Sequence, residues 1–516
     1  MSETGPPLAW YRSGPPPPPR GRWRWRAIPR VHKLDALLCL TLATLCFSQA
    51  SKETLYRSDA DFYSRLPLGA PTLLAFVASV LILTVVGFAA LKGLRRITNA
   101  RLTAVASAVA LLLALGFVRI AYETVSAVTD VFGRPVLLVA VLLLLAAACV
   151  RPAWALHVVR RTVFILSAWA ILTNFIAVWM LVEVGAGPKA QWVEPARLTT
   201  PPPSLRSVVW IVFGGLDQSL TFETRPAGFE LPELDRLRRE SVYADAALPP
   251  AGTTERSMAS LITGRSVLGV VPVSSIDLDL RFADGKTAKL SSPPHVFSNA
   301  RGLGYDTAVV GWHLPYPRIL GRSLGAAAFN SSVGWEQVRA VDFGRALFNH
   351  WESLVPPLHA RRLYAERVSE IGDVVFRAAT DGRFGLVLLH LPLPQTPGIY
   401  DRATGRLTAW NFARGEAPYL DNLALADRIL GELRRGLDRA RLDDRTWLVI
   451  TSDRPGPGDG RVPFLVRTPD GRSAHVDNAF STMGTQSLVL AILRGSVADT
   501  ADVVTWLTRH MPPPKH

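Results

Sequence analysis

The hydrophobic and polar positions divide the chain into two parts with different patterns. The first part carries five nearly continuous apolar segments, and most of them approach the length of about 20 residues that a membrane-crossing helix needs. They are roughly Leu34–Ala50, Ala70–Leu91, Leu102–Ala121, Pro135–Val150 and Thr162–Val184. The first and the fourth are shorter than the others. This pattern predicts a transmembrane region of about five α-helices.

From about residue 205 onward, short apolar runs alternate with amphipathic stretches. We predict strands at Val208–Phe213, Thr307–Gly311, Phe384–Leu391, Trp447–Thr451 and Pro463–Val466. We predict helices at Glu233–Glu240, Arg256–Thr263, His295–Gly302, Ala360–Ala379, Leu420–Leu437 and Gln486–Leu493. Strands that alternate with helices form a largely parallel sheet covered on both faces. The predicted fold class is therefore α/β, and ligands of such folds bind beyond the carboxyl ends of the strands.

Composition divides the chain further. Residues 1–32 contain the run GPPPPPRGRWRWR and are expected to form a disordered, basic cytoplasmic tail. Residues 33–184 hold the five apolar segments, and residues 185–204 form a Pro-rich linker. Residues 205–516 make up the predicted extracytoplasmic domain. With 516 residues, 49% of them hydrophobic, and a mean hydropathy of +0.20, the chain is too apolar for an ordinary soluble protein.

The net charge of +15 comes mainly from basic residues that flank the apolar segments, and this distribution indicates membrane topology rather than nucleic-acid binding. Seven basic residues precede the first apolar segment, four lie between the second and third, and three lie between the fourth and fifth. Basic residues flank membrane helices on the cytoplasmic side. The tail is then inside, and an odd number of crossings places everything after Val184 outside. The expected partner is a lipid bilayer, with no nucleic acid.

The three cysteines, Cys39, Cys46 and Cys149, all fall within apolar segments. The C-terminal domain therefore has neither a disulfide framework nor a thiolate metal site. A high ratio of Arg to Lys, with many Pro and Ala residues, is typical of a GC-rich bacterial genome. We expect a multi-pass protein of the bacterial inner membrane.

Polar side chains and glycines follow the predicted strands. Gly214 and Gly215 end the first strand in VVWIVFGGLDQS, and Thr254 begins a helix within LPPAGTTERSM. Asp453 and Arg454 follow the strand TWLVITSDR. Two histidines, His313 in GWHL and His390 in LVLLHLPLPQTP, also stand in or after strands. On the residues alone, Thr253 or Thr254 is a helix cap, and Asp453 with Arg454 is either a structural loop or a pair in which Arg454 holds an oxyanion.

In their order and spacing, these stretches resemble the sulfatase and alkaline-phosphatase superfamily over about residues 205–495. The helix PELDRL, the run SLITGR and the segment GYDTAVVGWH match the family's pattern as well. Membrane segments before an outward-facing domain also look like the lipoteichoic-acid synthase and phosphoglycerol-transferase branch. The resemblance implies an alkaline-phosphatase-like sandwich around the parallel sheet.

The resemblance further implies Thr254 as the nucleophile position and Arg454, His313 and His390 as an anion pocket. It places a metal-binding carboxylate where Gly214 stands and a histidine where Arg454 stands. Asp453 and Asp217 are the remaining candidate metal ligands. Neither a glycine nor a guanidinium binds a cation. Further departures are Gln395 in place of a second histidine and Trp312 where sulfatases insert a lysine. The signature for formylglycine is absent.

Three hypotheses follow. The first is a pseudoenzyme of the cell envelope with a degenerate metal site, without a cofactor, that binds an anionic group of a lipid or glycan, or a protein partner. The second is an active phosphoester or sulfate-ester hydrolase, or a phosphoglycerol- or phosphoethanolamine-type transferase, that uses Thr254 and one divalent metal (Mn, Mg, Ca or Zn). The third is a structural partner whose membrane helices carry the function.

Overall fold

The computed structural model describes residues 30–55, 70–94, 152–186, 206–274, 277–292, 294–331, 334–335 and 342–513. The chain divides into two compact units. One comprises residues 1–45 and 81–171, and the other comprises residues 46–80 and 172–516. The second unit contains the central sheet and all of the predicted site residues.

The apolar part of the chain forms four described helices: α1 (Arg30–Cys46), α2 (Ser48–Leu55), α4 (Ala70–Leu94) and α7 (Pro152–Ala186). Two stretches are long and apolar enough to cross a membrane, Ala70–Gly93 with a mean hydropathy of 2.6 and Val163–Val182 with 2.0. The expectation of about five such helices is therefore not met in the part of the chain that the structure describes. The segments predicted at Leu102–Ala121 and Pro135–Val150 lie outside the described residues.

The first predicted segment, Leu34–Ala50, is wrong as a single span. The chain forms α1 and α2 on either side of Phe47 instead. The apolar stretch is short because α1 begins with the polar residues RVHK and α2 carries the polar sequence SQASKE. Neither helix offers the roughly 20 apolar residues that crossing a bilayer requires.

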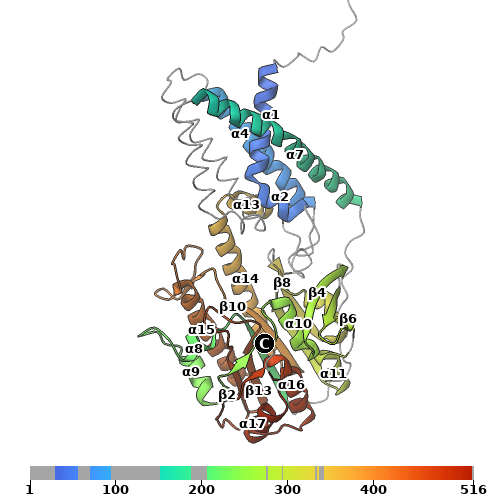
Figure 1. Ribbon diagram of the computed structural model, residues 1–516, viewed down its shortest axis with the longest axis vertical. Helices are drawn as coiled ribbons and strands as arrows, with labels where there is room; N and C mark the ends of the chain where they lie inside the picture. The colour runs from blue at the N-terminus through green and yellow to red at the C-terminus, as the bar shows by residue number, and fades with distance from the viewer. Residues whose placement is uncertain are drawn as a thin grey trace, which may run out of the picture. The chain divides into compact units, whose positions relative to one another are not determined.

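A nine-stranded sheet lies at the centre of the second unit (Figure 1). Its order is β15-β2-β14-β13-β1-β10-β7-β8-β9. The strands are β1 (Ser207–Gly214), β2 (Val242–Ala244), β7 (Asp306–Trp312), β8 (Ala326–Ser331), β9 (Gly334–Trp335), β10 (Phe384–Pro394), β13 (Thr446–Ser452), β14 (Phe464–Arg467) and β15 (Ala474–Val476). The five neighbours from β13 to β8 are parallel. This mixed α/β architecture with a mostly parallel sheet confirms the predicted class.

Helices cover both faces of the sheet because successive side chains of a buried strand point to opposite faces. Val208, Trp210 and Val212 of β1 pack into one apolar cluster with α10 (Thr254–Thr263), α11 (Val296–Gly302) and α16 (Thr485–Arg494). Val209 and Ile211 pack on the other face with α9 (Pro232–Arg239), α14 (Pro356–Ala379) and α15 (Ala417–Arg439). All five predicted strands and all six predicted helices are present, with ends shifted by a few residues.

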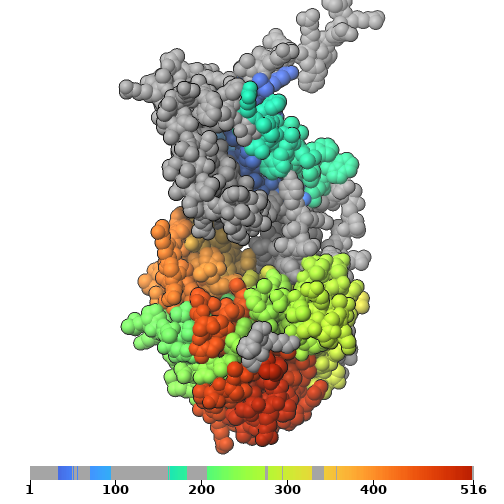
Figure 2. Space-filling model, viewed as in Figure 1, coloured from blue at the N-terminus to red at the C-terminus, as the bar shows by residue number. Residues whose placement is uncertain are grey.

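Several further elements were not predicted from the sequence. They are α8 (Gln218–Phe222), α12 (Tyr316–Leu320), α13 (Phe343–Glu352), α17 (Thr500–Arg509), a sheet of β4 (Val267–Ser274), β5 (Asp277–Phe282) and β6 (Thr287–Lys289), and the pairs β11 (Tyr400–Asp401) with β12 (Arg406–Leu407) and β3 (Ala247–Leu248) with β16 (Phe480–Ser481). Figure 2 shows the C-terminal segment, in red, beside the yellow-green segment of α10 and α11, which contact α16.

A buried carboxylate joins two of the helices on one face. Asp427 of α15 accepts hydrogen bonds from the backbone N–H groups of Leu234, at 2.7 Å, and Glu233, at 3.3 Å, in the first turn of α9. These N–H groups have no partner within their own helix. Burial raises the pKa of Asp427 from 3.8 to about 6.

We therefore expect Asp427 to make stability depend on pH. Because its folded pKa is raised, its contribution is most favourable below pH 3.8 and is lost as the pH rises through about 6. Asp427→Asn should flatten the change in the thermal unfolding midpoint across this window, measured on the full chain in detergent. Asp438→Asn, at an exposed position of α15, is the matched control. An unchanged pH profile in Asp427→Asn would contradict the assignment.

Candidate functional site

The predicted site residues of three neighbouring strands lie together because the strands are parallel and in register. Val212 of β1 lies opposite His390 of β10, and Phe213 lies opposite Ser452 of β13. The backbone N–H of Asp453 donates to the carbonyl of Phe213 at 2.9 Å. The carboxyl ends of β1, β10 and β13 thus bring Gly214, His390 and Asp453 to one place, as expected for a fold of this kind.

Asp453 is the centre of this cluster and is fully buried. Its Oδ1 accepts a hydrogen bond from the backbone N–H of Gly215 at 3.1 Å. Its Oδ2 accepts the hydroxyl proton of Thr254 at 2.5 Å. A buried carboxylate needs such donors because it has lost its hydration shell. Asp453 therefore ties β13 to the loop after β1 and to the first turn of α10.

The two glycines after β1 are required for different reasons. Gly215 has a φ of +80°, a left-handed conformation that glycine adopts without strain. Gly214 has close neighbours: a Cβ at this position would lie 3.2 Å from the carbonyl oxygen of Leu391 and 3.3 Å from Cζ2 of Trp312. The backbone of β10 and the Trp312 ring thus fill the space that a carboxylate at position 214 would need.

Thr254 is the first residue of α10 and is buried. The residue at the helix cap is Thr253, whose side chain makes no capping hydrogen bond to the backbone. The hydroxyl of Thr254 is directed to Asp453 instead. The structure therefore places Thr254 next to Asp453 and not in the role of a cap.

His390 connects Asp453 to Tyr316 of α12. The Nδ1 atom of His390 lies 2.7 Å from the Tyr316 hydroxyl, and its Nε2 lies 3.7 Å from Oδ2 of Asp453. Burial lowers the pKa of His390 and raises the pKa of Tyr316 well above its usual value. Among the described residues, nothing accepts a hydrogen bond from Nε2. No pattern in the sequence marked Tyr316 as a member of the site.

Arg454 flanks Asp453 on the side of the β10 loop. Its Nη2 donates to Oε1 of Gln395, and its Nε lies 3.9 Å from Oδ1 of Asp453. Within the described part of the chain, Nε is a buried donor without a hydrogen-bond partner. One third of the side chain is exposed. The side chain is thus partly exposed, and its buried Nε is an unused donor.

His313 pairs with α10. Its Nε2 lies 2.6 Å from Oε1 of Glu255, and its backbone has a left-handed φ of +67°. Left-handed conformations are uncommon for residues with a Cβ and often occur at functional positions. Glu255 stands beside Thr254 in the run TERSM, but that position gave no signal of a pairing with a histidine 58 residues further on.

The side chain of Asp217 accepts hydrogen bonds from two segments of the chain. Its Oδ1 accepts hydrogen bonds from the N–H of Leu220, at 2.9 Å, and the hydroxyl of Ser219, at 2.8 Å. Its Oδ2 accepts from the N–H of Gly458 at 2.8 Å. Asp217 is therefore the N-cap of α8 and anchors the loop after β13. Both of its oxygens accept hydrogen bonds from these donors, and its expected pairing with Asp453 as a metal ligand stays a prediction.

The residues around Asp453 do not fit a divalent cation. A metal such as Mg²⁺ or Ca²⁺ is bound mainly by carboxylate and carbonyl oxygens. Here the carboxylate faces an N–H, a hydroxyl, an imidazole and a guanidinium, most of which are proton donors. In the ranges that the structure describes, no three His, Cys, Asp or Glu side chains gather as a metal site.

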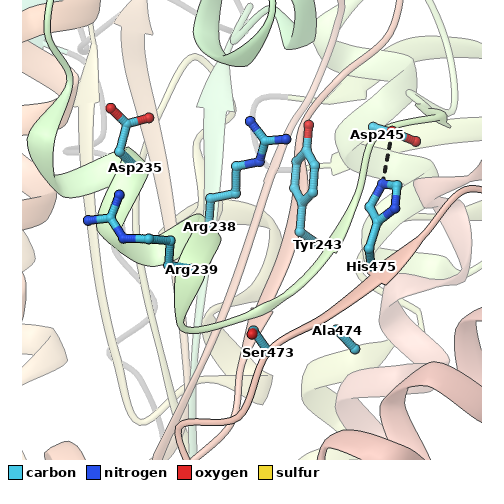
Figure 3. Close-up of a pocket in the computed structure, with 8 residues that line it drawn as sticks. All are labelled: Asp235, Arg238, Arg239, Tyr243, Asp245, Ser473, Ala474 and His475. Carbon is cyan, nitrogen blue, oxygen red and sulfur yellow. Dashed lines mark hydrogen bonds and ion pairs between the residues drawn. The ribbon is translucent and has the colours of Figure 1, made fainter.

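A separate polar groove of about 490 Å³ lies between α9 and the strands β2 and β15, of which β15 is the edge strand of the sheet (Figure 3). It is lined by Asp235, Arg238, Arg239, Tyr243, Asp245, Ser473, Ala474 and His475. The Tyr243 ring stacks on His475, whose Nε2 lies 2.9 Å from Oδ2 of Asp245. None of the predicted site residues lines this groove. The contacts of His475 with Tyr243 and Asp245 join β15 to β2 and the residue that follows it.

No family model and no curated protein matches the chain. Solved structures with a similar arrangement include a sulfatase from Pseudoalteromonas sp., with 14% identity over 56% of this chain and 67% of the other and a TM-score of 0.38. Another is a phosphonate monoester hydrolase from Silicibacter pomeroyi, with 14% identity over 60% of this chain and 78% of the other and a TM-score of 0.39. A third is a protein in the alkaline phosphatase superfamily from Vibrio parahaemolyticus, with 11% identity over 58% of this chain and 68% of the other and a TM-score of 0.34. At these identities and scores, the likeness assigns no activity to this chain.

The crowding at Gly214 can be tested by a double-mutant cycle. Gly214→Ala should lower the free energy of unfolding by about 1–3 kcal/mol because the new methyl group meets β10 and Trp312. With Trp312→Ala present, the added cost should shrink by about 0.5–3 kcal/mol. Gly252→Ala is the control, since a Cβ there has no atom within 4 Å. Strictly additive losses would contradict contact between positions 214 and 312.

The pairing of Glu255 with His313 predicts acid sensitivity. The hydrogen bond from His313 lowers the pKa of Glu255 from 4.5 to about 2. A lowered folded pKa stabilises the protein above pH 4.5, and this stabilisation is lost as the pH falls toward 2. His313→Asn, which tolerates the left-handed backbone, should reduce the fall in unfolding midpoint below pH 4.5. An equally steep fall in the unfolding midpoint of His313→Asn would show that the Glu255–His313 pair does not cause the acid sensitivity.

Proposed function

We propose that this chain is a membrane-anchored, sulfatase-like protein of the alkaline-phosphatase superfamily that binds an anionic group without metal-dependent hydrolysis. One observation carries the proposal: both oxygens of the buried Asp453 are held by proton donors, Gly215 N–H and Thr254 O–H. In a metal-dependent hydrolase those oxygens would face a cation. The superfamily assignment rests on the motif order in the sequence.

Arg454 is the residue we assign to the anion. Its side chain is partly exposed, its buried Nε is an unused donor, and Asp453 balances its charge only from 3.9 Å. A phosphate or sulfate group presents oxygens that a guanidinium binds with two parallel hydrogen bonds. The group would compete with Gln395 for Nη2. Binding at this edge would agree with the general position of ligands in parallel α/β sheets.

We propose the envelope membrane as the site of action. The apolar stretches Ala70–Gly93 and Val163–Val182 are long enough to anchor the chain. The distribution of basic residues along the sequence supports an extracytoplasmic position for the residues after Val184. A phosphate- or sulfate-bearing lipid or glycan of the envelope is the ligand class that this location and Arg454 support together.

A second candidate function is ester hydrolysis or transfer with Thr254 as nucleophile. The observation that favours it is the 2.5 Å hydrogen bond from the Thr254 hydroxyl to Asp453, which would accept the proton as the oxygen attacks phosphorus or sulfur. The bond to the leaving alcohol would then break. Against it, Thr254 is buried, which restricts the approach of an ester.

Binding without turnover can be tested on the full chain in detergent. Phosphate at a hundredfold excess over its Kd should stabilise the wild-type protein by about 2.7 kcal/mol, and Arg454→Ala should abolish this stabilisation. Arg472→Ala, at an exposed arginine outside the site, should retain it. Removal of metals with EDTA should leave the unfolding midpoint unchanged.

The same preparations decide between the two functions. We expect no hydrolysis of aryl phosphate or aryl sulfate above a Thr254→Ala baseline, with or without added Mn²⁺, Mg²⁺, Ca²⁺ or Zn²⁺. Thr254→Ser, which keeps the hydroxyl for Asp453, controls for the loss of that hydrogen bond. Turnover that disappears in Thr254→Ala and returns in Thr254→Ser, with stoichiometric bound metal, would refute the binding protein and support the enzyme.

A further inference from the structure

The helix α13 has an apolar outer surface that no sequence pattern predicted. Ala346 and His350 are buried on its inner side. Phe343 and Phe348 are 43% and 53% exposed, and in the turn that leads to α14 Leu354 and Val355 are 37% and 52% exposed. We call these four residues the α13 surface. Large apolar side chains gathered at one place on a protein surface mark an interaction site.

The inner side of α13 packs on the beginning of α4. The Phe76 ring of α4 meets His350 edge to face with centroids 6.1 Å apart, and the imidazole also hydrogen-bonds the backbone of Ala75. Phe47, between α1 and α2, meets Trp351 in the same manner at 5.6 Å. All of these residues belong to the second unit. The position of α13 relative to the start of α4 is therefore defined by direct contacts.

These contacts set the depth of α13 if α4 spans a bilayer. Phe76 lies six residues from Ala70, the first residue of the apolar stretch, which is about 9 Å along a helix. A side chain at that height stands close to the boundary between hydrocarbon and headgroups, because the whole stretch is only slightly longer than the hydrocarbon core. Helix α13 must then lie at the membrane surface.

The chemistry of the α13 surface suits that boundary. Aromatic side chains are enriched at membrane interfaces, and an amphipathic helix buries its apolar face there. Several charged groups nearby form ion pairs with one another: Arg345 with Glu366, and Arg362 with Glu352 and Glu366. Because these groups neutralise one another, contact through the α13 surface does not depend on an anionic lipid.

An exposed aromatic pair adjoins the same region. Trp410 is 72% exposed and meets Phe412 edge to face. Arg361, in the second turn of α14, donates through Nε to the carbonyl of Asn411 at 2.7 Å and lies over the Phe412 ring. The pair is thus fixed to the end of α14 that follows α13, and it extends the apolar region beyond the four residues of the α13 surface.

We infer that the α13 surface docks on the outer leaflet of the lipid bilayer and fixes the sheet unit at the membrane. Figure 1 shows α14 running from α13 to the sheet, where the Tyr364 hydroxyl donates to the carbonyls of Pro392 and Gln395. Gln395 also accepts a hydrogen bond from the Arg454 guanidinium, so α14 is connected to the site. With α13 docked, the site would therefore stay at a constant distance from the bilayer. The inference rests on the membrane anchoring proposed above.

Spin labels on the full chain in lipid nanodiscs test the docking. In a background with the three native cysteines replaced by alanine, Phe348→Cys and Val355→Cys carry labels on the α13 surface. Leu81→Cys reports on the span itself, and Leu303→Cys, at an exposed apolar position at the end of α11, is the water-exposed control. Power saturation with oxygen and with a water-soluble nickel chelate measures the accessibility of each label.

We expect the ratio of oxygen to nickel accessibility at positions 348 and 355 to exceed that at 303 several-fold, in zwitterionic as well as anionic lipid. A lipid-exposed label at 81 together with a ratio at 348 and 355 equal to that at 303 would overturn docking alone. A water-exposed label at 81 would refute membrane anchoring and docking together. Labels at 348 and 355 that are shielded from both reagents and broadened by dipolar coupling would assign this face to a second copy and overturn the proposal.

Discussion

The arrangement at the carboxyl ends of the parallel strands depends on the burial of one negative charge, the carboxylate of Asp453. A carboxylate without solvent is costly unless donors replace its hydration, and here the donors are the N–H of Gly215 and the hydroxyl of Thr254. These two groups come from the loop after β1 and from α10. The need to satisfy Asp453 therefore holds three separate elements of the fold in register.

The surrounding side chains are consistent with this role. His390 lies between Asp453 and the Tyr316 hydroxyl, and Arg454 provides a positive charge beside Asp453. Trp312 occupies the space beside Gly214 that a second carboxylate would need. Each of these residues is compatible with a single carboxylate that accepts hydrogen bonds. Two or three carboxylates without a cation in the same volume would repel one another.

The connection between this site and the apolar part of the chain runs through α14. The helix begins directly after α13 and ends against the sheet, with Tyr364, Val368 and Ile371 buried in the same apolar cluster as β1 and β10. A continuous helix transmits position well because its hydrogen bonds are internal. The position of the loop that carries Gln395 is therefore fixed relative to the residues that contact α4 as well as relative to the sheet.

The amino-acid sequence by itself determined five strands of the central sheet and the six helices that cover its faces. Buried parallel strands are nearly all apolar, as in VVWIVF, and the covering helices repeat their apolar positions with helical spacing, so both signals are local. Only the tertiary structure decided which carboxylate serves the site. Asp217 and Asp453 look alike in sequence, yet one caps α8 and the other accepts the hydroxyl of Thr254, 199 residues away. The space beside Gly214, the contact of Tyr316 with His390 and the apolar surface of α13 were likewise not predictable. They depend on distances between segments far apart in the chain, and no local pattern encodes such distances.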